Sequence, residues 1–109
     1  MIARIWNGST RQADADRYVT HLRRNVIPQL ASIDGYRGIQ VLRRERGDAV
    51  AFLVMTFWDS MDAIRAFTGP DTDVAVVAPE AQAVLTAYDR YTIHFEVAVG
   101  TENFLSDQL

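Results

Sequence analysis

The chain has 109 residues and a mass of 12.3 kDa, enough for one hydrophobic core but not for two, so we expect a single domain over residues 1–109. Hydrophobic residues make up 49% and charged residues 23%, as in an ordinary folded domain; with no apolar run long enough to span a bilayer and no secretion signal, we expect a cytoplasmic protein. The net charge of −3 disfavours nucleic-acid and membrane-surface binding, and the absence of cysteine excludes disulfides, thiolate metal ligands and cysteine nucleophiles.

The first two predicted elements are a strand and a long helix. The strand covers Ile2–Asn7 and is closed by a Gly-Ser-Thr turn, in which Ser9 and Gln12 have the spacing of a capping box. The helix is predicted from one apolar stripe at helical spacing, formed by Ala15, Tyr18, Val19, Leu22, Val26, Ile27 and Leu30. Pro28 removes a hydrogen bond inside this helix, so we expect a kink or a weakened last turn near it and a helix end by Gly35.

A β-hairpin is predicted next. Tyr36–Arg46 and Ala49–Trp58 have the composition of strands, and the Gly-Asp pair that begins at Gly47 suits a tight turn between them. A short helix then extends to about Phe67, capped by Ser60 or by the aspartate before it.

A second short helix and a fourth strand complete the core, which covers residues 2–99. Pro79–Ala87 is predicted as a helix because proline suits the first helical position. The strand Tyr91–Val99 alternates: one face carries Tyr91, Ile93, Phe95, Val97 and Val99, and the other carries Thr92, His94, Glu96 and Ala98. Residues 100–109 form a polar tail.

The order β-α-β-β-α-β predicts an α+β domain of the ferredoxin-like split βαβ type, a four-stranded antiparallel sheet with helices on one face. The strand Ala49–Trp58 is apolar on both faces, although helices cover only one face of such a sheet. A second copy of the sheet is the economical cover, so we predict a symmetric homodimer packed sheet to sheet, with the tail pair Phe104-Leu105 reaching the partner. The alternative is that the strand is merely central and tolerates its small outward residues.

Three residues are candidates for chemistry. His94 lies on the less apolar face of the last strand; it is either a general base or substrate hydrogen-bond donor, or an ordinary histidine of the strand or the dimer interface. Trp58 either walls a pocket or fills the end of the barrel. Asn7 either donates to a ligand oxygen or caps the turn after the first strand.

Other motifs are interpreted as structural. The G-x-x-G segment that begins at Gly35 is a turn rather than a nucleotide clamp, and the basic run over residues 43–46 is a solvated rim. His21 falls on the polar side of the first helix and is not a candidate. His94 and Glu96 share a strand face but lack a third ligand, so we expect no metal site.

Nearly the whole core, residues 2–99, resembles the antibiotic biosynthesis monooxygenase family of the dimeric α+β barrel superfamily. The resemblance is carried by Ile2-Ala-Arg-Ile-Trp6, by Val54-Met-Thr-Phe-Trp58-Asp-Ser-Met-Asp-Ala-Ile64 and by the ending Arg90-Tyr-Thr-Ile-His94-Phe-Glu96-Val, which is similar to a branch of bacterial members. It implies the same fold and the same homodimer that the strand Ala49–Trp58 predicts.

The resemblance implies two alternative activities. The branch that oxygenates aromatics without a cofactor is similar at Trp58, although Val54 replaces its asparagine. The haem-degrading branch is similar at Asn7 and Trp58, but this chain has no histidine near Pro79, where that branch has its haem ligand. We therefore expect a monooxygenase without cofactor that acts on a phenolic or polyketide-like aromatic. A haem-binding or non-catalytic small-molecule-binding homodimer is the alternative.

For such an oxygenase we expect an apolar pocket between sheet and helices. In it His94 is the base, Asn7 a hydrogen-bond donor and Trp58 a wall, and the substrate-binding residues are Phe52, Val54, Phe57 and Phe67. The resemblance implies that the ring anion itself gives an electron to oxygen, so the protein deprotonates and orients the substrate and excludes water.

Overall fold

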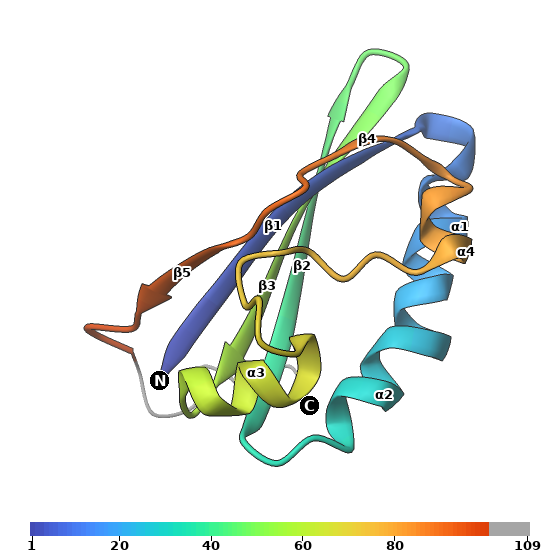
Figure 1. Ribbon diagram of the computed structural model, residues 1–109. Helices are drawn as coiled ribbons and strands as arrows, with labels where there is room; N and C mark the ends of the chain where they lie inside the picture. Colours follow the sequence, from blue (N-terminus) through green and yellow to red (C-terminus); the bar gives the residue numbers. More distant parts are fainter. Residues whose placement is uncertain (101–109) are drawn as a thin grey trace.

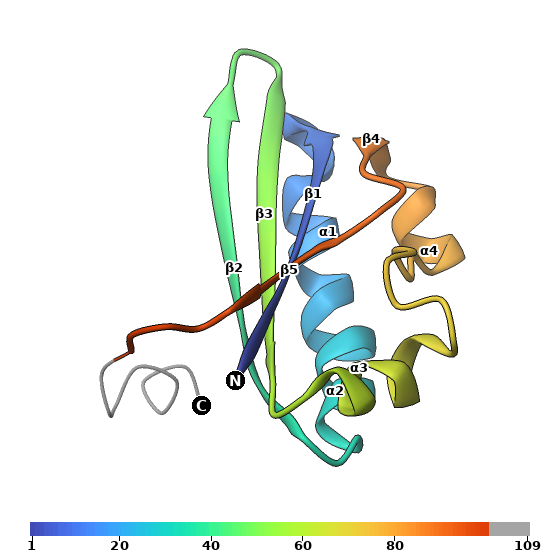
Figure 2. The same ribbon diagram turned by 60° about the vertical axis from the view of Figure 1, so that its left-hand side comes forward.

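The computed structural model describes residues 1–100, which form one antiparallel sheet with the helices packed on one face (Figures 1 and 2). The strands are β1 (Ile2–Arg11), β2 (Tyr36–Arg46), β3 (Ala49–Trp58), β4 (Leu85–Tyr88) and β5 (Ile93–Glu96). The helices are α1 (Ala15–His21), α2 (Ile27–Ala31), α3 (Met61–Thr68) and α4 (Pro79–Gln82). Within the described residues, no helix is both long and apolar enough to cross a membrane. The tail pair Phe104-Leu105 lies outside the described residues.

β1 is the strand around which the sheet is organised. The strand order is β2-β3-β1-β4, and β5 also pairs with β1. β4 and β5 occupy two lengths of the same edge of β1, since Gly8 pairs with Tyr88 and Ile5 with Ile93. This topology confirms the predicted ferredoxin-like α+β class, but the sheet has five strands where the sequence predicts four.

The additional strand comes from the segment predicted as the second helix. α4 ends at Gln82 rather than at Ala87, and Leu85–Tyr88 pairs with β1 instead. The edge of β1 offers backbone hydrogen bonds to this segment, and such tertiary pairing overrides a weak helical preference. The predicted strand Tyr91–Val99 is shorter in the structure, where β5 ends at Glu96.

β1 is longer than predicted. It continues past Asn7 to Arg11, and its ladder with β3 is unbroken up to the pair Arg11↔Ala49. Ser9 is therefore inside the sheet, opposite Ala51, and the predicted capping box is not formed. The helical region begins instead with a 3-10 turn at Gln12–Asp14.

The irregularity predicted near Pro28 is present. Between α1 and α2 the chain makes a π-helical turn, Leu22–Val26, in which the amide of Ile27 donates to the carbonyl of Leu22. Proline has no amide hydrogen to donate, so the regular ladder is interrupted just before it. The predicted hairpin has the bounds of β2 and β3, and Ser60 caps α3 by accepting from the amide of Ala63, as predicted.

The helix-covered face of the sheet carries two separate clusters of buried side chains. The first contains Trp6, Ala15, Tyr18, Leu22, Val50, Phe52, Ala81 and Val84. The second contains Leu30, Trp58 and Ile64, with Tyr36 and Phe67 packed against it. The two clusters lie at two ends of the protein interior. The pocket described below is lined by residues of both.

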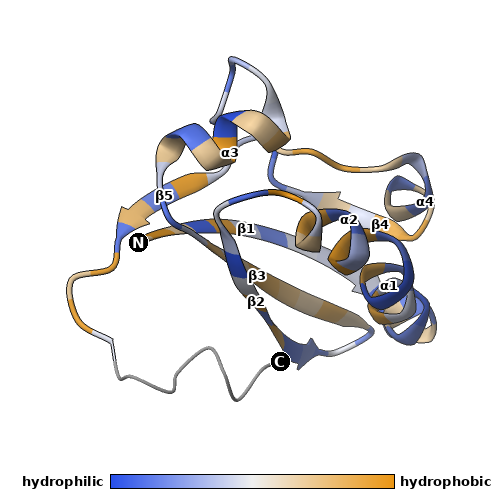
Figure 3. Ribbon diagram, turned by 90° about the horizontal axis from the view of Figure 1, so that it is seen from below, coloured by the Kyte–Doolittle hydropathy of each residue, from blue (hydrophilic) through white to orange (hydrophobic). Residues whose placement is uncertain are grey.

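The opposite face of the sheet bears no helix in the described part of the chain (Figure 3), and large apolar side chains are exposed on it. Leu42, Ile93 and Phe95 expose 49%, 60% and 55% of their surface. The ladder sets Ile93 beside Ile5, which is itself opposite Met55 of β3. A monomer would thus leave a contiguous apolar surface in water.

Candidate functional site

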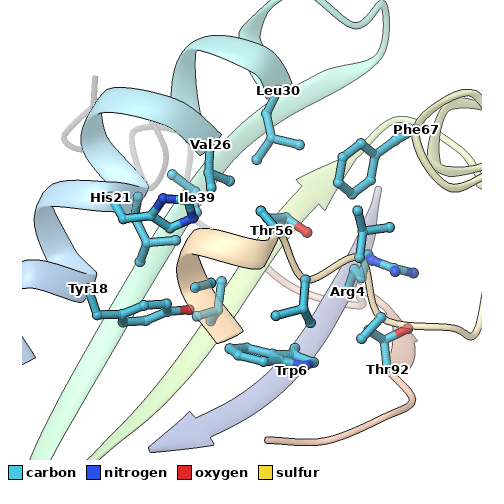
Figure 4. A pocket seen from close by; sticks show the side chains of 17 residues that line it. Arg4, Trp6, Tyr18, His21, Val26, Leu30, Ile39, Thr56, Phe67 and Thr92 are labelled. Atoms are coloured by element: carbon cyan, nitrogen blue, oxygen red, sulfur yellow. The ribbon is translucent and has the colours of Figure 1, made fainter. Parts of the chain in front are cut away.

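A pocket lies between the helix-covered face of the sheet and the helices (Figure 4). Its volume is about 90 Å³, and residues from both buried clusters line it, including Trp6 and Tyr18 of the first and Leu30 of the second. Aliphatic and aromatic side chains make up most of its wall, so the few polar side chains that line it are the candidates for ligand recognition. Arg4 is the only arginine among its lining residues.

Arg4 is a buried cation held by the segment that covers the pocket. Its side chain is on the inner face of β1 and only 4% of its surface is exposed. The guanidinium donates through Nη1 to the carbonyl of Thr72 and through Nη2 to that of Val74, at 3.0 Å. Burial lowers the pKa of Arg4 to about 10, partly opposed by Asp73, so the group is still charged at neutral pH.

His94 contacts Arg4 from the neighbouring strand β5, where the two residues are paired in register. Nη1 of Arg4 lies 2.9 Å from Nε2 of His94, which must therefore accept, and Nδ1 of the ring lies 3.5 Å from Oδ1 of Asp73. Burial lowers the pKa of His94, the Arg4 cation lowers it further, and Asp73 acts in the opposite direction. The neutral imidazole of His94 thus helps to hold the guanidinium of Arg4 in place.

Two polar residues of α1 reach the pocket from the helix side. Tyr18 is 3% exposed and His21 is 8% exposed. The prediction that His21 lies on the polar side of the first helix is wrong, because His21 is buried. His21 is three residues after Tyr18 and next to Leu22, so it lies beside the apolar stripe, and this spacing was the signal for it.

Val54 and Phe67, two of the predicted substrate-binding residues, line the pocket. Phe52 does not; it packs in the first cluster with its ring centroid 4.9 Å from that of Tyr18. Phe57 alternates with the inward residues Thr56 and Trp58 of β3, so its side chain is on the opposite face of the sheet, where it is buried.

The three predicted catalytic residues are not brought together. Trp58 is fully buried in the second cluster, directly behind the pocket wall: its indole Nε1 donates to Thr56 at 2.9 Å and its ring stacks on Phe67. Asn7 alternates with Trp6 on β1 and is exposed on the outer side, where its amide donates to Asp89. His94 reaches the pocket only through Arg4.

The size of the pocket restricts what it can hold as formed. Its 90 Å³ is less than the roughly 150 Å³ of an apolar cavity that binds one benzene ring. One wall of the pocket, residues 75–78, belongs to a segment between α3 and α4 that is neither helix nor strand. The segment is held by the hydrogen bonds from Arg4 and by the amide of Ala75, which donates to the carbonyl of Arg90. A ligand of one ring therefore requires a modest displacement of this wall.

The chain matches the model of the antibiotic biosynthesis monooxygenase family over residues 1–77. Among curated proteins, none matches. Similar solved structures include a protein assigned to the antibiotic biosynthesis monooxygenases of Bacillus cereus, with a TM-score of 0.63 and 14% identity, covering 92% of this chain and 95% of that one.

A second similar structure is the haem-degrading protein MhuD of Mycobacterium tuberculosis with two haems bound in its active site, with a TM-score of 0.57 and 22% identity over 93% of this chain and 99% of that one. A third, from Chloroflexus aurantiacus and again assigned to the antibiotic biosynthesis monooxygenases, has a TM-score of 0.57 and 16% identity over 92% and 95% of the two chains. At these identities the structures show a common fold.

Proposed function

The chain belongs to the antibiotic biosynthesis monooxygenase family, and from this premise we propose that it binds a phenolic or polyketide-like aromatic in the pocket and oxygenates it without a cofactor. The observation that carries the proposal is Arg4, a buried cation in a mostly apolar pocket. A positive charge there favours the ionised form of a phenol, because an opposite charge nearby lowers the pKa of an acid. Apolar walls accept the ring, and the cation selects and holds the oxygen.

The reaction uses molecular oxygen as the co-reactant. The phenolate ring gives electrons to oxygen, a bond forms between a ring carbon and one oxygen atom, and the other oxygen atom leaves as water with two hydrogens from the substrate. The product is a quinone, so one phenol and one O₂ give one quinone and one water. The residues of the chain supply orientation, charge and exclusion of water.

His94 remains our proposed base. Its lowered pKa keeps the ring neutral at pH 7 and so able to accept a proton. Nε2 is engaged with Arg4, so the proton reaches it only when the guanidinium turns toward the ligand oxygen. Trp58 supports the wall through Thr56 and Phe67, and the proposal does not use Asn7, which is on the outer face.

Haem binding is the alternative that the structural neighbours raise. A porphyrin has four pyrrole rings, whereas the pocket is smaller than a cavity for one benzene ring. His21 lines the pocket, but the walls leave no room for a macrocycle beside it. As formed, the pocket does not fit haem, and no step of the proposed reaction uses it.

We also propose that the protein is a homodimer whose two sheets pack face to face. The support comes from the uncovered face of the sheet, where Leu42, Ile93 and Phe95 are exposed although they are large and apolar. Contiguous apolar patches of this kind mark association sites. A second copy of the chain carries the same apolar patch, so the two patches can pack on each other in a two-fold symmetric interface.

Resorcinol, a single-ring dihydroxy-aromatic, tests the reaction. We expect the protein to consume one O₂ for each hydroxyquinone formed and, with ¹⁸O₂, to place one labelled atom in the product. Arg4→Met should lower the rate about 100-fold, as expected when a charge-stabilising group is lost. Arg65→Met is the matched control, because Arg65 is exposed and, among the described residues, its side chain pairs only with Asp62 on α3.

Two outcomes would contradict the proposal. One is the absence of oxygen consumption by the parent protein. The other is a saturable shift of the Soret band when haem is titrated, abolished by His21→Ala, which would establish the haem-binding alternative.

A further inference from the structure

Two buried polar side chains on α1 have no role in the reaction proposed above. Tyr18 and His21 lie one turn apart, both line the pocket, and both are more than nine-tenths buried. Figure 4 shows them at one side of the pocket, with Arg4 and Thr92 at the other. The pocket therefore has a polar group at each end, and the wall between them is mostly apolar, with Thr56 as its polar residue.

The hydroxyl of Tyr18 makes no hydrogen bond with any of the described residues, and it points toward the pocket in Figure 4. Its ring is fixed from both sides, by Phe52 at 4.9 Å and by His21 at 6.4 Å between centroids. Burial raises the pKa of Tyr18, so the hydroxyl keeps its proton. It is a positioned donor without an acceptor.

His21 presents a second donor at the same end. The side-chain amide nitrogen of Asn25 lies 3.0 Å from Nδ1 of His21. An amide nitrogen can only donate, so Nδ1 accepts and the proton of the neutral ring is on Nε2. Nε2 has no hydrogen-bond partner within residues 1–100, and the ring lines the pocket.

Neither donor atom is fully enclosed, because no enclosed side-chain nitrogen or oxygen of the described residues lacks a partner. Both are therefore free to donate to an acceptor that enters the pocket. We propose that Tyr18 and His21 together bind a carbonyl or hydroxyl oxygen of the ligand, at the end of the ring opposite Arg4. The lining of the pocket supports this, because Arg4, Tyr18 and His21 all contribute to it and one ligand can meet both ends. The inference rests on the proposed function and narrows the substrate class to aromatics with oxygen at both ends.

A pair of ligands of similar shape tests this without any turnover. 4-Hydroxyacetophenone carries a carbonyl opposite its phenol, and 4-ethylphenol lacks that oxygen. By isothermal titration calorimetry the parent should bind the ketone roughly tenfold more tightly, the preference that one satisfied buried hydrogen bond supplies. Tyr18→Phe and His21→Phe should each reduce this ratio and leave the affinity for 4-ethylphenol nearly unchanged.

Tyr36→Phe is the matched control, because it removes the same hydroxyl from a ring that packs on Trp58 in the second cluster. It should keep the ratio of the parent. A ratio near one in the parent, or a ratio unchanged in both α1 variants, would overturn the inference. If resorcinol is not oxidised but the ketone preference follows the α1 variants, the inference stands and the proposed oxygenation falls.

Discussion

The protonation of His94 is set by the residues packed around it. Desolvation lowers its pKa, the Arg4 cation adds to this effect, and Asp73 partly reverses it. The unfolded chain therefore binds this proton at a higher pH than the folded protein does. It follows that the free energy of unfolding decreases as the pH falls below the ordinary histidine value of 6.5, until the folded ring is protonated too.

We predict that His94→Gln removes this part of the pH dependence, because glutamine does not titrate. Chemical denaturation at intervals between about pH 7.5 and about pH 5 measures it. The stability of the variant relative to the parent should increase as the pH is lowered. Two parallel curves would show that the ring has the same pKa in both states.

Gly8 makes room for the indole of Trp6. A Cβ at this position would lie 2.6 Å from Cη2 of Trp6 and 3.3 Å from Cδ2 of Leu85. The indole is held by its hydrogen bond to the carbonyl of Asp89, at 2.8 Å, and cannot move freely. We predict that Gly8→Ala lowers the free energy of unfolding by about 1–3 kcal/mol, as overpacking does.

Thermal and urea unfolding measure this change. Gly100→Ala is the control, since within residues 1–100 the nearest atom to its added Cβ is 3.8 Å away. Equal stability of Gly8→Ala and the parent would mean that the indole has another position available.

At the residue scale, the sequence could predict which strand residues of the site face inward, because side chains alternate along a strand. An inward Trp6 on β1 therefore places Arg4 inward and Asn7 outward. Arg4 was not predicted as a site residue, because charged residues are rarely buried. Its partners, the carbonyls of Thr72 and Val74, are far along the chain, and no local signal connects them to Arg4.

α3 depends on its cap and carries part of both the core and the pocket. Ser60 accepts from the amide of Ala63 at 3.2 Å; Ile64 of this helix is fully buried and Phe67 lines the pocket. We predict that Ser60→Ala costs about 1 kcal/mol of unfolding free energy, the usual value for a lost cap.

Ser60→Asp retains an oxygen that can accept the same hydrogen bond, so it should be as stable as the parent. Thermal unfolding of the three proteins provides the comparison. If alanine and aspartate were equally destabilising, the hydroxyl would have a role other than capping.

Elements with strong local signals were predicted correctly, whereas β4, which forms only by pairing with the distant strand β1, was predicted as part of a helix. The hairpin needs only its turn at Gly47, which has φ +61°, and the π-helical turn follows from Pro28. Leu85–Tyr88 forms β4 because the edge of β1 is available for pairing there. The sequence of this segment alone does not predict a strand.

For the whole molecule, the uncovered face of the sheet supports the proposed homodimer. We predict that Ile93→Glu makes the protein monomeric, because the substitution would bury an unpaired carboxylate in the proposed interface. Light scattering during gel filtration should give the mass of two chains for the parent and 12.3 kDa for the variant.

Ala66→Glu places the same charge on the exposed surface of α3, on the helix side of the sheet, and should remain dimeric. A parent protein with the mass of one chain at micromolar concentration would contradict the sheet-to-sheet dimer.

The order of elements predicted the fold, because short antiparallel connections leave few ways to arrange these strands. The volume of the pocket could not be predicted in this way. It depends on how closely residues 75–78 approach the sheet, and their position is determined by Arg4 and by the amide of Ala75 rather than by their own sequence.

The separation of the two tryptophans between the two clusters gives the protein an intrinsic optical reporter. Trp6 forms part of the pocket wall, whereas Trp58 is enclosed among Leu30, Ile64 and Phe67. Replacement of Trp58 by phenylalanine would leave one emitting indole, in direct contact with anything that enters the pocket. Quenching of its fluorescence would then follow occupancy in solution without a dye or a label.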